Sequence, residues 1–75
     1  MGRPRFHGGR LVQFLVQRGC VIVDNDPGQC CVRAPNGKTA IIHHNDPDLG
    51  FIYAEFILEL LEIPPGDFAA YLEGK

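Results

Sequence analysis

The dipeptide Asn36-Gly37 is the feature that most constrains this fold, because it stands between two short segments typical of β-strands. Asn-Gly favours the tight turn that joins antiparallel neighbours. We therefore expect a hairpin made of residues 29–34 and 39–43. Residues 20–23 are rich in β-branched side chains and predict another strand, followed by a loop at residues 24–28 that is dense in turn formers. The expected sheet is antiparallel and three-stranded.

Helical patterns flank these strands. Residues 10–18 place apolar side chains at helical spacing, and Gly19 stands where a left-handed residue would end the helix. Residues 49–62 predict a second helix, with Asp46 as the expected cap at its entrance. A short third helix over residues 67–72 follows a break rich in proline.

These elements predict one α+β domain with the order α-β-β-β-α. Its three-stranded antiparallel sheet is packed by two helices, and a short helix follows at the C-terminal end. We assign residues 10–75 to this domain and residues 1–9 to a flexible basic tail. A chain of 75 residues buries only about 60% of its surface and is marginally stable, which favours assembly with another chain.

The helix over residues 49–62 carries more apolar side chains than one sheet face can hide. Glu55, Glu59 and Glu62 share a stripe of about 60°, and apolar residues occupy most of the remaining circumference. Either a neighbouring helix covers the excess, or it is buried in an intermolecular interface. The second alternative predicts a homodimer whose interface residues are Tyr53, Ile57, Leu58 and Leu61.

Composition predicts a cytoplasmic protein without a membrane partner. No apolar run approaches the ~20 residues that span a bilayer, and the first residues lack the apolar segment of a signal peptide. Two of the three cysteines, Cys30 and Cys31, are neighbours on an expected strand and face opposite sides, so they cannot bridge each other. This cysteine usage fits a reducing compartment.

Charge is distributed unevenly along the chain. Residues 1–38 contain six basic side chains and two acidic ones, whereas residues 39–75 contain one basic and seven acidic ones. The two halves are either differently solvated surfaces or complementary surfaces that meet a partner or a second copy.

The order and spacing of these elements resemble the HicA family of small toxins, which act as mRNA interferases. Residues 11–23 resemble the family's opening helix, glycine and first strand, and residues 33–38 resemble its basic residue and Asn-Gly turn. His43 and His44 stand at the strand end where the family often keeps one or two histidines. The resemblance runs from about residue 11 to residue 68. It implies a fold like that of double-stranded RNA-binding domains and an antitoxin-like protein partner.

The sequence departs from this family at the position of the presumed catalytic histidine, where Gln29 stands. RNA cleavage through the 2′-OH needs a group that exchanges protons near pH 7, which an imidazole does and a neutral amide does not. His43 and His44 are the remaining candidates for catalysis. The second helix is acidic, whereas a phosphate backbone is held chiefly by Lys and Arg.

The sequence is therefore compatible with three functions. The leading hypothesis is a HicA-like domain with a lost or altered nuclease centre that acts as a protein-binding module. The alternatives are an active HicA-type mRNA interferase that uses His43 or His44, and an uncharacterised structural domain. Arg33, Lys38, His43 and His44 are the candidates for contact with RNA or a partner, or else solvated charges. No Cys or His spacing typical of a metal site occurs, and we expect no metal and no cofactor.

Overall fold

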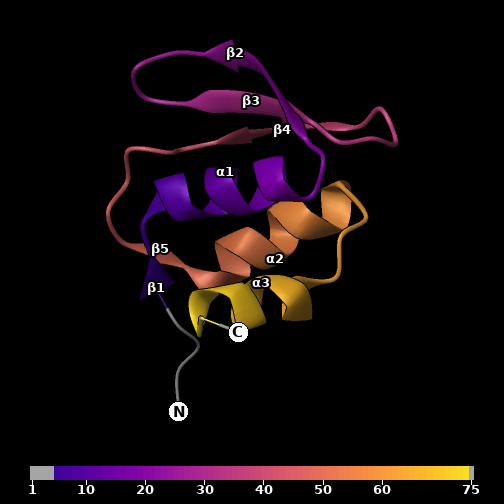
Figure 1. Ribbon diagram of the computed structural model, residues 1–75. Coiled ribbons are helices and arrows are strands. Elements are labelled where there is room, and N and C mark those ends of the chain that lie inside the picture. Colours follow the sequence, from indigo (N-terminus) through magenta and orange to yellow (C-terminus); the bar gives the residue numbers. More distant parts are fainter. Residues whose placement is uncertain (1–4, 75) are drawn as a thin grey trace.

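A computed structural model describes residues 5–74 of the chain (Figure 1). Its eight helices and strands follow one another in the order β1 (Arg5–Phe6), α1 (Gly8–Gln17), β2 (Val21–Asn25), β3 (Cys30–Arg33), β4 (Thr39–Ile42), β5 (Leu49–Gly50), α2 (Phe51–Leu60) and α3 (Pro65–Leu72). The predicted order of helix, three strands, helix and short C-terminal helix is thus present, and the additional elements are the two short strands β1 and β5.

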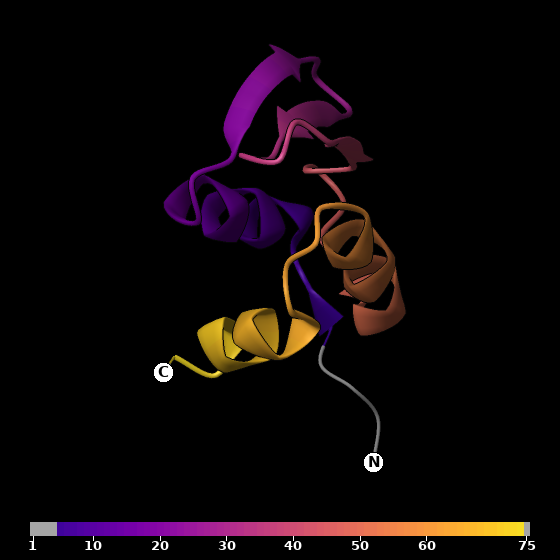
Figure 2. The same cartoon turned by 90° about the vertical axis from the view of Figure 1, so that its right-hand side faces the viewer.

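The main sheet is three-stranded and antiparallel, with the strand order β2-β3-β4, as the sequence predicts. The three helices lie on one side of it (Figures 1 and 2). The class is therefore α+β. The turn at Asn36-Gly37 joins β3 to β4, and Gly37 has a φ of +89°, which is the left-handed conformation that this turn requires.

Alternation along β3 and β4 determines which sheet face is buried. Cys30 and Val32 are buried, and their partners across the ladder, Ile42 and Ala40, are buried as well. Paired residues share a face, so these four side chains point toward the helices. The opposite face carries Arg33 and the other intervening residues, which are exposed or half-buried.

An aromatic cluster closes the core on the side away from the sheet. The Phe68 side chain of α3 is fully buried, and its ring lies 5.0 Å from that of Phe6, 5.2 Å from that of Phe14 and 5.9 Å from that of Phe51. Burying a phenylalanine contributes about 1.5–3 kcal/mol. α3 is therefore an integral layer of the core.

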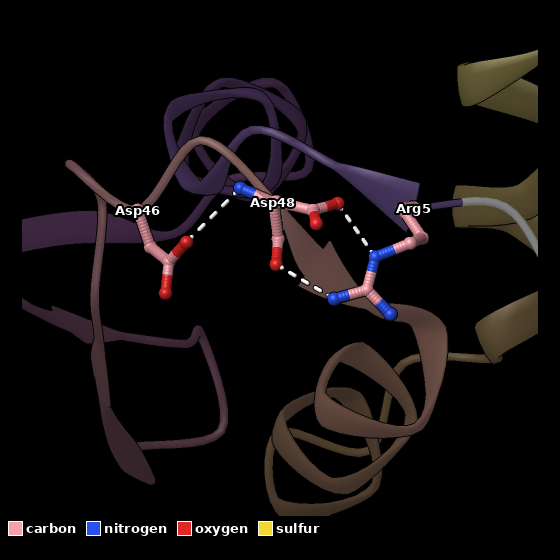
Figure 3. Close-up of polar contacts among 3 residues, drawn as sticks. All are labelled: Arg5, Asp46 and Asp48. Carbon is pink, nitrogen blue, oxygen red and sulfur yellow. Dashed lines mark hydrogen bonds and ion pairs between the residues drawn. The ribbon is translucent and has the colours of Figure 1, made fainter.

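The chain enters the fold earlier than the expected boundary at residue 10. Arg5–Phe6 pairs with Leu49–Gly50 in a small antiparallel sheet, and α1 begins at Gly8. The Arg5 guanidinium contacts a carboxylate oxygen of Asp48 at 2.5 Å and donates to its backbone carbonyl at 2.9 Å (Figure 3). Residues 1–4 of the expected tail lie outside the described residues.

Each of the two longer helices is followed by a residue in the left-handed conformation, which ends the helix. At the end of α1, Gly19 has a φ of +95°, and the Cys20 N–H donates to the Leu15 carbonyl at 2.9 Å. At the end of α2, Glu62 takes this conformation with a φ of +60°, and the Ile63 N–H donates to the Leu58 carbonyl at 2.9 Å. These are Schellman motifs. The predicted end of the first helix at Gly19 is confirmed.

The predicted start of the second helix is wrong. Asp46 does not cap α2, because β5 intervenes and the helix begins at Phe51 after the N-cap residue Gly50. The Asp46 carboxylate instead accepts the Asp48 backbone N–H at 3.0 Å (Figure 3), an Asx turn. The Asp-Pro pattern therefore marks a turn rather than a helix entrance.

Three of the four residues assigned to an interface belong to the protein's own core. Ile57, Leu58 and Leu61 are 4%, 0% and 2% exposed, because α2 packs against β4 and α3. Tyr53 is half-buried. Those three side chains are thus unavailable to a partner unless the domain opens. Among residues 5–74, no helix has the length and apolar character needed to cross a membrane.

Candidate functional site

Gln29, His43 and His44 lie at one end of the main sheet, which we call the histidine end. Gln29 closes the turn between β2 and β3, where its carbonyl accepts the Asp26 N–H at 2.9 Å. His43 and His44 follow β4 directly. Because Cys30 pairs with Ile42, Gln29 and His43 stand one residue beyond this last pair, and alternation assigns both to the exposed face. The structure brings the three predicted residues to the same end.

His44 is held by the turn between β2 and β3. Its Nε2 lies 2.9 Å from the carbonyl oxygen of Asp26, and its neighbour Asn45 donates to the carbonyl of Pro27. A carbonyl oxygen only accepts, so Nε2 carries the proton in this contact. His44 is consequently a positioning group for the turn, and only its Nδ1 is available to accept a proton from a ligand.

His43 is exposed and lies beside Tyr53 of α2. The two rings are 6.1 Å apart, and the His43 backbone N–H donates to the Tyr53 hydroxyl at 3.1 Å. The same hydroxyl donates to the Ile41 carbonyl at 3.3 Å. Tyr53 thus satisfies two backbone groups along the outer edge of β4. The sequence predicts Tyr53 in an apolar interface and gives no sign of this role, since the contact depends on how α2 sits beside the sheet.

The start of α1 packs closely under the histidine end. A Cβ atom on Gly8 would lie 2.1 Å from the His43 carbonyl oxygen, and the Gly8 N–H donates to the Asp46 carbonyl at 2.8 Å. The Nδ1 of His7 accepts the Gly9 N–H at 3.0 Å and caps the helix. Only glycine fits at position 8, because the two backbones touch there.

The two predicted basic contact residues are in different situations. The Nζ of Lys38 lies 2.8 Å from a carboxylate oxygen of Glu62, and the hydrogen bond from Lys38 is the main reason that the pKa of Glu62 is lowered. Arg33 lies on the exposed sheet face, and its guanidinium forms no hydrogen bond or ion pair with any described residue. Lys38 therefore holds the hairpin turn to the end of α2. Of the two residues, Arg33 is the one whose charge is available to a ligand.

The exposed apolar surface of α2 is formed by three side chains spaced by four residues. Ile52, Phe56 and Leu60 are 77%, 64% and 43% exposed, and we call them the α2 stripe. Glu59 lies next to the stripe on the helix surface, about 20° from Ile52. The position of the glutamates was a partial signal, because the residues on one flank of the acidic row are exposed while Phe51 and Leu58 on the other flank are buried. None of the three stripe residues is among the interface residues that the sequence predicts.

The geometry of the described residues does not favour a small-molecule pocket or a metal site. A hollow of about 240 Å³ lies between the hairpin turn and the end of α2; it is lined by Arg18, Pro35, Asn36, Leu61, Glu62 and Ile63. Small-molecule sites are usually about 300–1,000 Å³ and mostly apolar. Among residues 5–74, no three His, Cys, Asp or Glu side chains converge as a metal site would require. Burial raises the pKa of the Cys20 and Cys30 thiols, so both stay protonated and unreactive at neutral pH.

Comparisons with protein-family models, with curated proteins and with solved structures found no match for this chain.

Proposed function

We propose that the protein is a HicA-like domain without nuclease activity that binds a partner protein through the α2 stripe. The observation that carries the proposal is the exposure of Ile52, Phe56 and Leu60 on a helix whose opposite side forms the core. Aligned apolar residues on one exposed helix face are typical of the contact between a helix and a groove or a second helix.

The charge beside the α2 stripe indicates the chemistry of the partner. Glu59 is exposed next to Ile52, and Glu55 lies one turn before it on the same side. A complementary surface presents apolar side chains to the stripe and Lys or Arg to the glutamates. The same glutamates repel a phosphate backbone, which supports a protein rather than RNA as the ligand of this face.

The histidine end supports the absence of cleavage. Gln29 occupies the position at which the resemblance implies a catalytic histidine, and an amide cannot act as a general base. His44 uses Nε2 to hold the turn at Asp26. Loss of a general base typically lowers the rate by about 10²–10⁴.

Site-specific photocrosslinking in the native cell tests the binding proposal. With p-benzoylphenylalanine at position 56, we expect one discrete adduct that contains a basic protein, whereas the same group at the exposed α1 residue Gln17 gives none. The purified adduct partner should bind the wild-type domain, and Phe56→Glu should weaken that binding at least tenfold. Failure to crosslink at position 56, or equal adducts at both positions, contradicts the proposal.

A second candidate function is RNA cleavage by His43, because it is exposed at the same end of the sheet as Gln29. The test is incubation of the purified protein with RNA, together with growth after induction in a bacterial host. We expect no cleavage and no growth arrest. Cleavage by the wild-type protein that disappears in His43→Ala or His44→Ala would establish the nuclease instead. Gln29→His is the matched variant that restores the missing imidazole.

A further inference from the structure

The two edges of the main sheet differ in whether their outward backbone N–H and C=O groups have hydrogen-bond partners. At the β4 edge, the Tyr53 hydroxyl bonds to the Ile41 carbonyl and the His43 N–H, and α2 packs alongside. At the β2 edge, no helix or strand of the described residues lies beyond the strand (Figures 1 and 2). Apart from the ladder with β3, no hydrogen bond among residues 5–74 engages the backbone of residues 21–25. One edge is protected and the other is open.

The open edge is also apolar. All five residues of β2 are exposed, and Val21, Ile22 and Val23 keep 54%, 42% and 44% of their surface in contact with solvent. Ile22 pairs with the buried Val32 and so faces the helix side, yet the helices do not cover it. An uncharged run of β-branched residues on a free edge is a template for pairing with another strand.

An irregularity in β2 places opposite charges on one face of the sheet. The register shifts between Ile22 and Asp24, so that Asp24 pairs with Cys31 and Val21 pairs with Arg33. Strict alternation would put Asp24 on the helix side, but the bulge at Val23 moves it to the same open face as Arg33. The side chains of Asp24 and Arg33 are diagonal neighbours within one chain, and neither forms a hydrogen bond or ion pair with a side chain of the described residues.

We propose that β2 pairs antiparallel with β2 of a second copy of this chain to form a continuous six-stranded sheet. We place Val21 opposite Asp24 of the second copy. One row of side chains on the open face then consists of Arg33 and Val21 of one copy, followed by Asp24 and Cys31 of the other. Arg33 then lies two strand spacings, about 10 Å, from Asp24 of the second copy, within reach of an extended guanidinium. The two-fold axis repeats this contact, so each copy adds a second carboxylate on the same sheet face to the one that its own chain places beside Arg33.

The interface is small, which sets the expected affinity. A pair of five-residue strands buries less than the roughly 1,600 Å² of a standard interface, so the dimer dissociates on dilution. This surface is separate from the α2 stripe. The two proposals therefore stand or fall independently.

Sedimentation equilibrium of the full chain from about 10 μM to about 1 mM tests the pairing. The expected mass rises from 8.3 kDa toward twice that value. Arg33→Glu and Asp24→Arg should each raise the dimer dissociation constant about tenfold, because each places like charges across the axis twice. The double variant exchanges the charges and should restore the dimer. Circular dichroism confirms that each variant is folded.

Phe56→Glu is the matched control, because it adds a charge to the other exposed apolar surface and should leave the dimer unchanged. A constant mass of 8.3 kDa across the concentration range overturns the proposal. A dimer that Phe56→Glu dissociates, or one that ignores both charge reversals, overturns it as well and assigns the interface to another surface.

Discussion

The helices α1 and α2 are both ten residues long and lie on the same side of the sheet, yet they use their apolar residues differently. α1 buries one face, with Leu11 and Leu15 fully enclosed, and turns its polar residues outward. α2 buries Leu58 and Ile57 on one side and exposes Phe56 on the other. A three-stranded sheet covers about half of a helix, so an apolar second half is in excess of what the fold needs. Such an excess points to a contact outside the chain.

The largest expected effect separates the two sides of α2. Leu58→Ala should lower the free energy of unfolding by about 2–5 kcal/mol, because Leu58 is fully buried and its removal leaves a cavity. Phe56→Ala should change it by no more than about 0.5 kcal/mol, because that ring is 64% exposed. Urea denaturation followed by circular dichroism measures both values. Similar losses for the two variants would show that Phe56 also contributes to the core.

The next effect concerns the close packing at the start of α1. Gly8→Ala should cost about 1–3 kcal/mol, because the added Cβ would lie 2.1 Å from a backbone oxygen and the chain must shift. Gly9→Ala is the comparison, since its Cβ would lie 3.2 Å from Nδ1 of the His7 ring and 3.6 Å from the His44 carbonyl oxygen. This second variant should cost less than Gly8→Ala, because only the His7 side chain has to move and alanine favours a helix. Thermal unfolding compares the two, and equal melting temperatures would contradict the close approach.

The ends of the two helices provide a smaller contrast. Gly19→Ala at the end of α1 should cost about 1 kcal/mol, because an L-residue is strained at a φ of +95°. Glu62→Gly at the end of α2 relieves the same strain but removes the exposed ion pair with Lys38, so we expect a small gain in stability. Denaturant midpoints of both variants test the contrast. Destabilisation by Glu62→Gly would mean that the ion pair outweighs the strain.

The smallest expected effect is the pH dependence of the contact between Glu62 and Lys38. Because the pKa of Glu62 is lowered below its ordinary value of 4.5, its contribution to stability is complete above that value. It is lost as the pH falls through the lowered pKa. The difference in melting temperature between the wild-type protein and Glu62→Gln should therefore be present at pH 7 and vanish in acid. A difference that persists at low pH would assign it to packing instead.

Features encoded by neighbouring residues were predictable from the sequence. Asn36-Gly37 specified the hairpin, Gly19 the end of α1, and alternation the opposite orientation of Cys30 and Cys31. Features that depend on distant contacts were not. Arg5 contacts Asp48, which is 43 positions away in the sequence, and the Phe6 ring packs against the distant Phe68 ring.

The candidate site follows the same division. Strand register predicts that Gln29 and His43 share an end of the sheet, because this depends only on the hairpin. The role of Tyr53 and the exposure of Phe56 depend on the rotation of α2 about its axis, and periodicity alone leaves that rotation open. The acidic row on α2 carried part of this information, since it marks one border of the side that faces water but not the flank on which the exposed residues continue.

The contacts of Phe68 also determine the order in which this chain can mature. Its ring packs between side chains from β1, α1 and the start of α2, so elements from both ends of the described chain contribute to a single cluster. During synthesis, the first sixty residues can form the hairpin and α1 but lack this closing ring. The domain therefore reaches its final packing only after α3 has emerged, and until then Phe6, Phe14 and Phe51 are surfaces for chaperones or for aggregation.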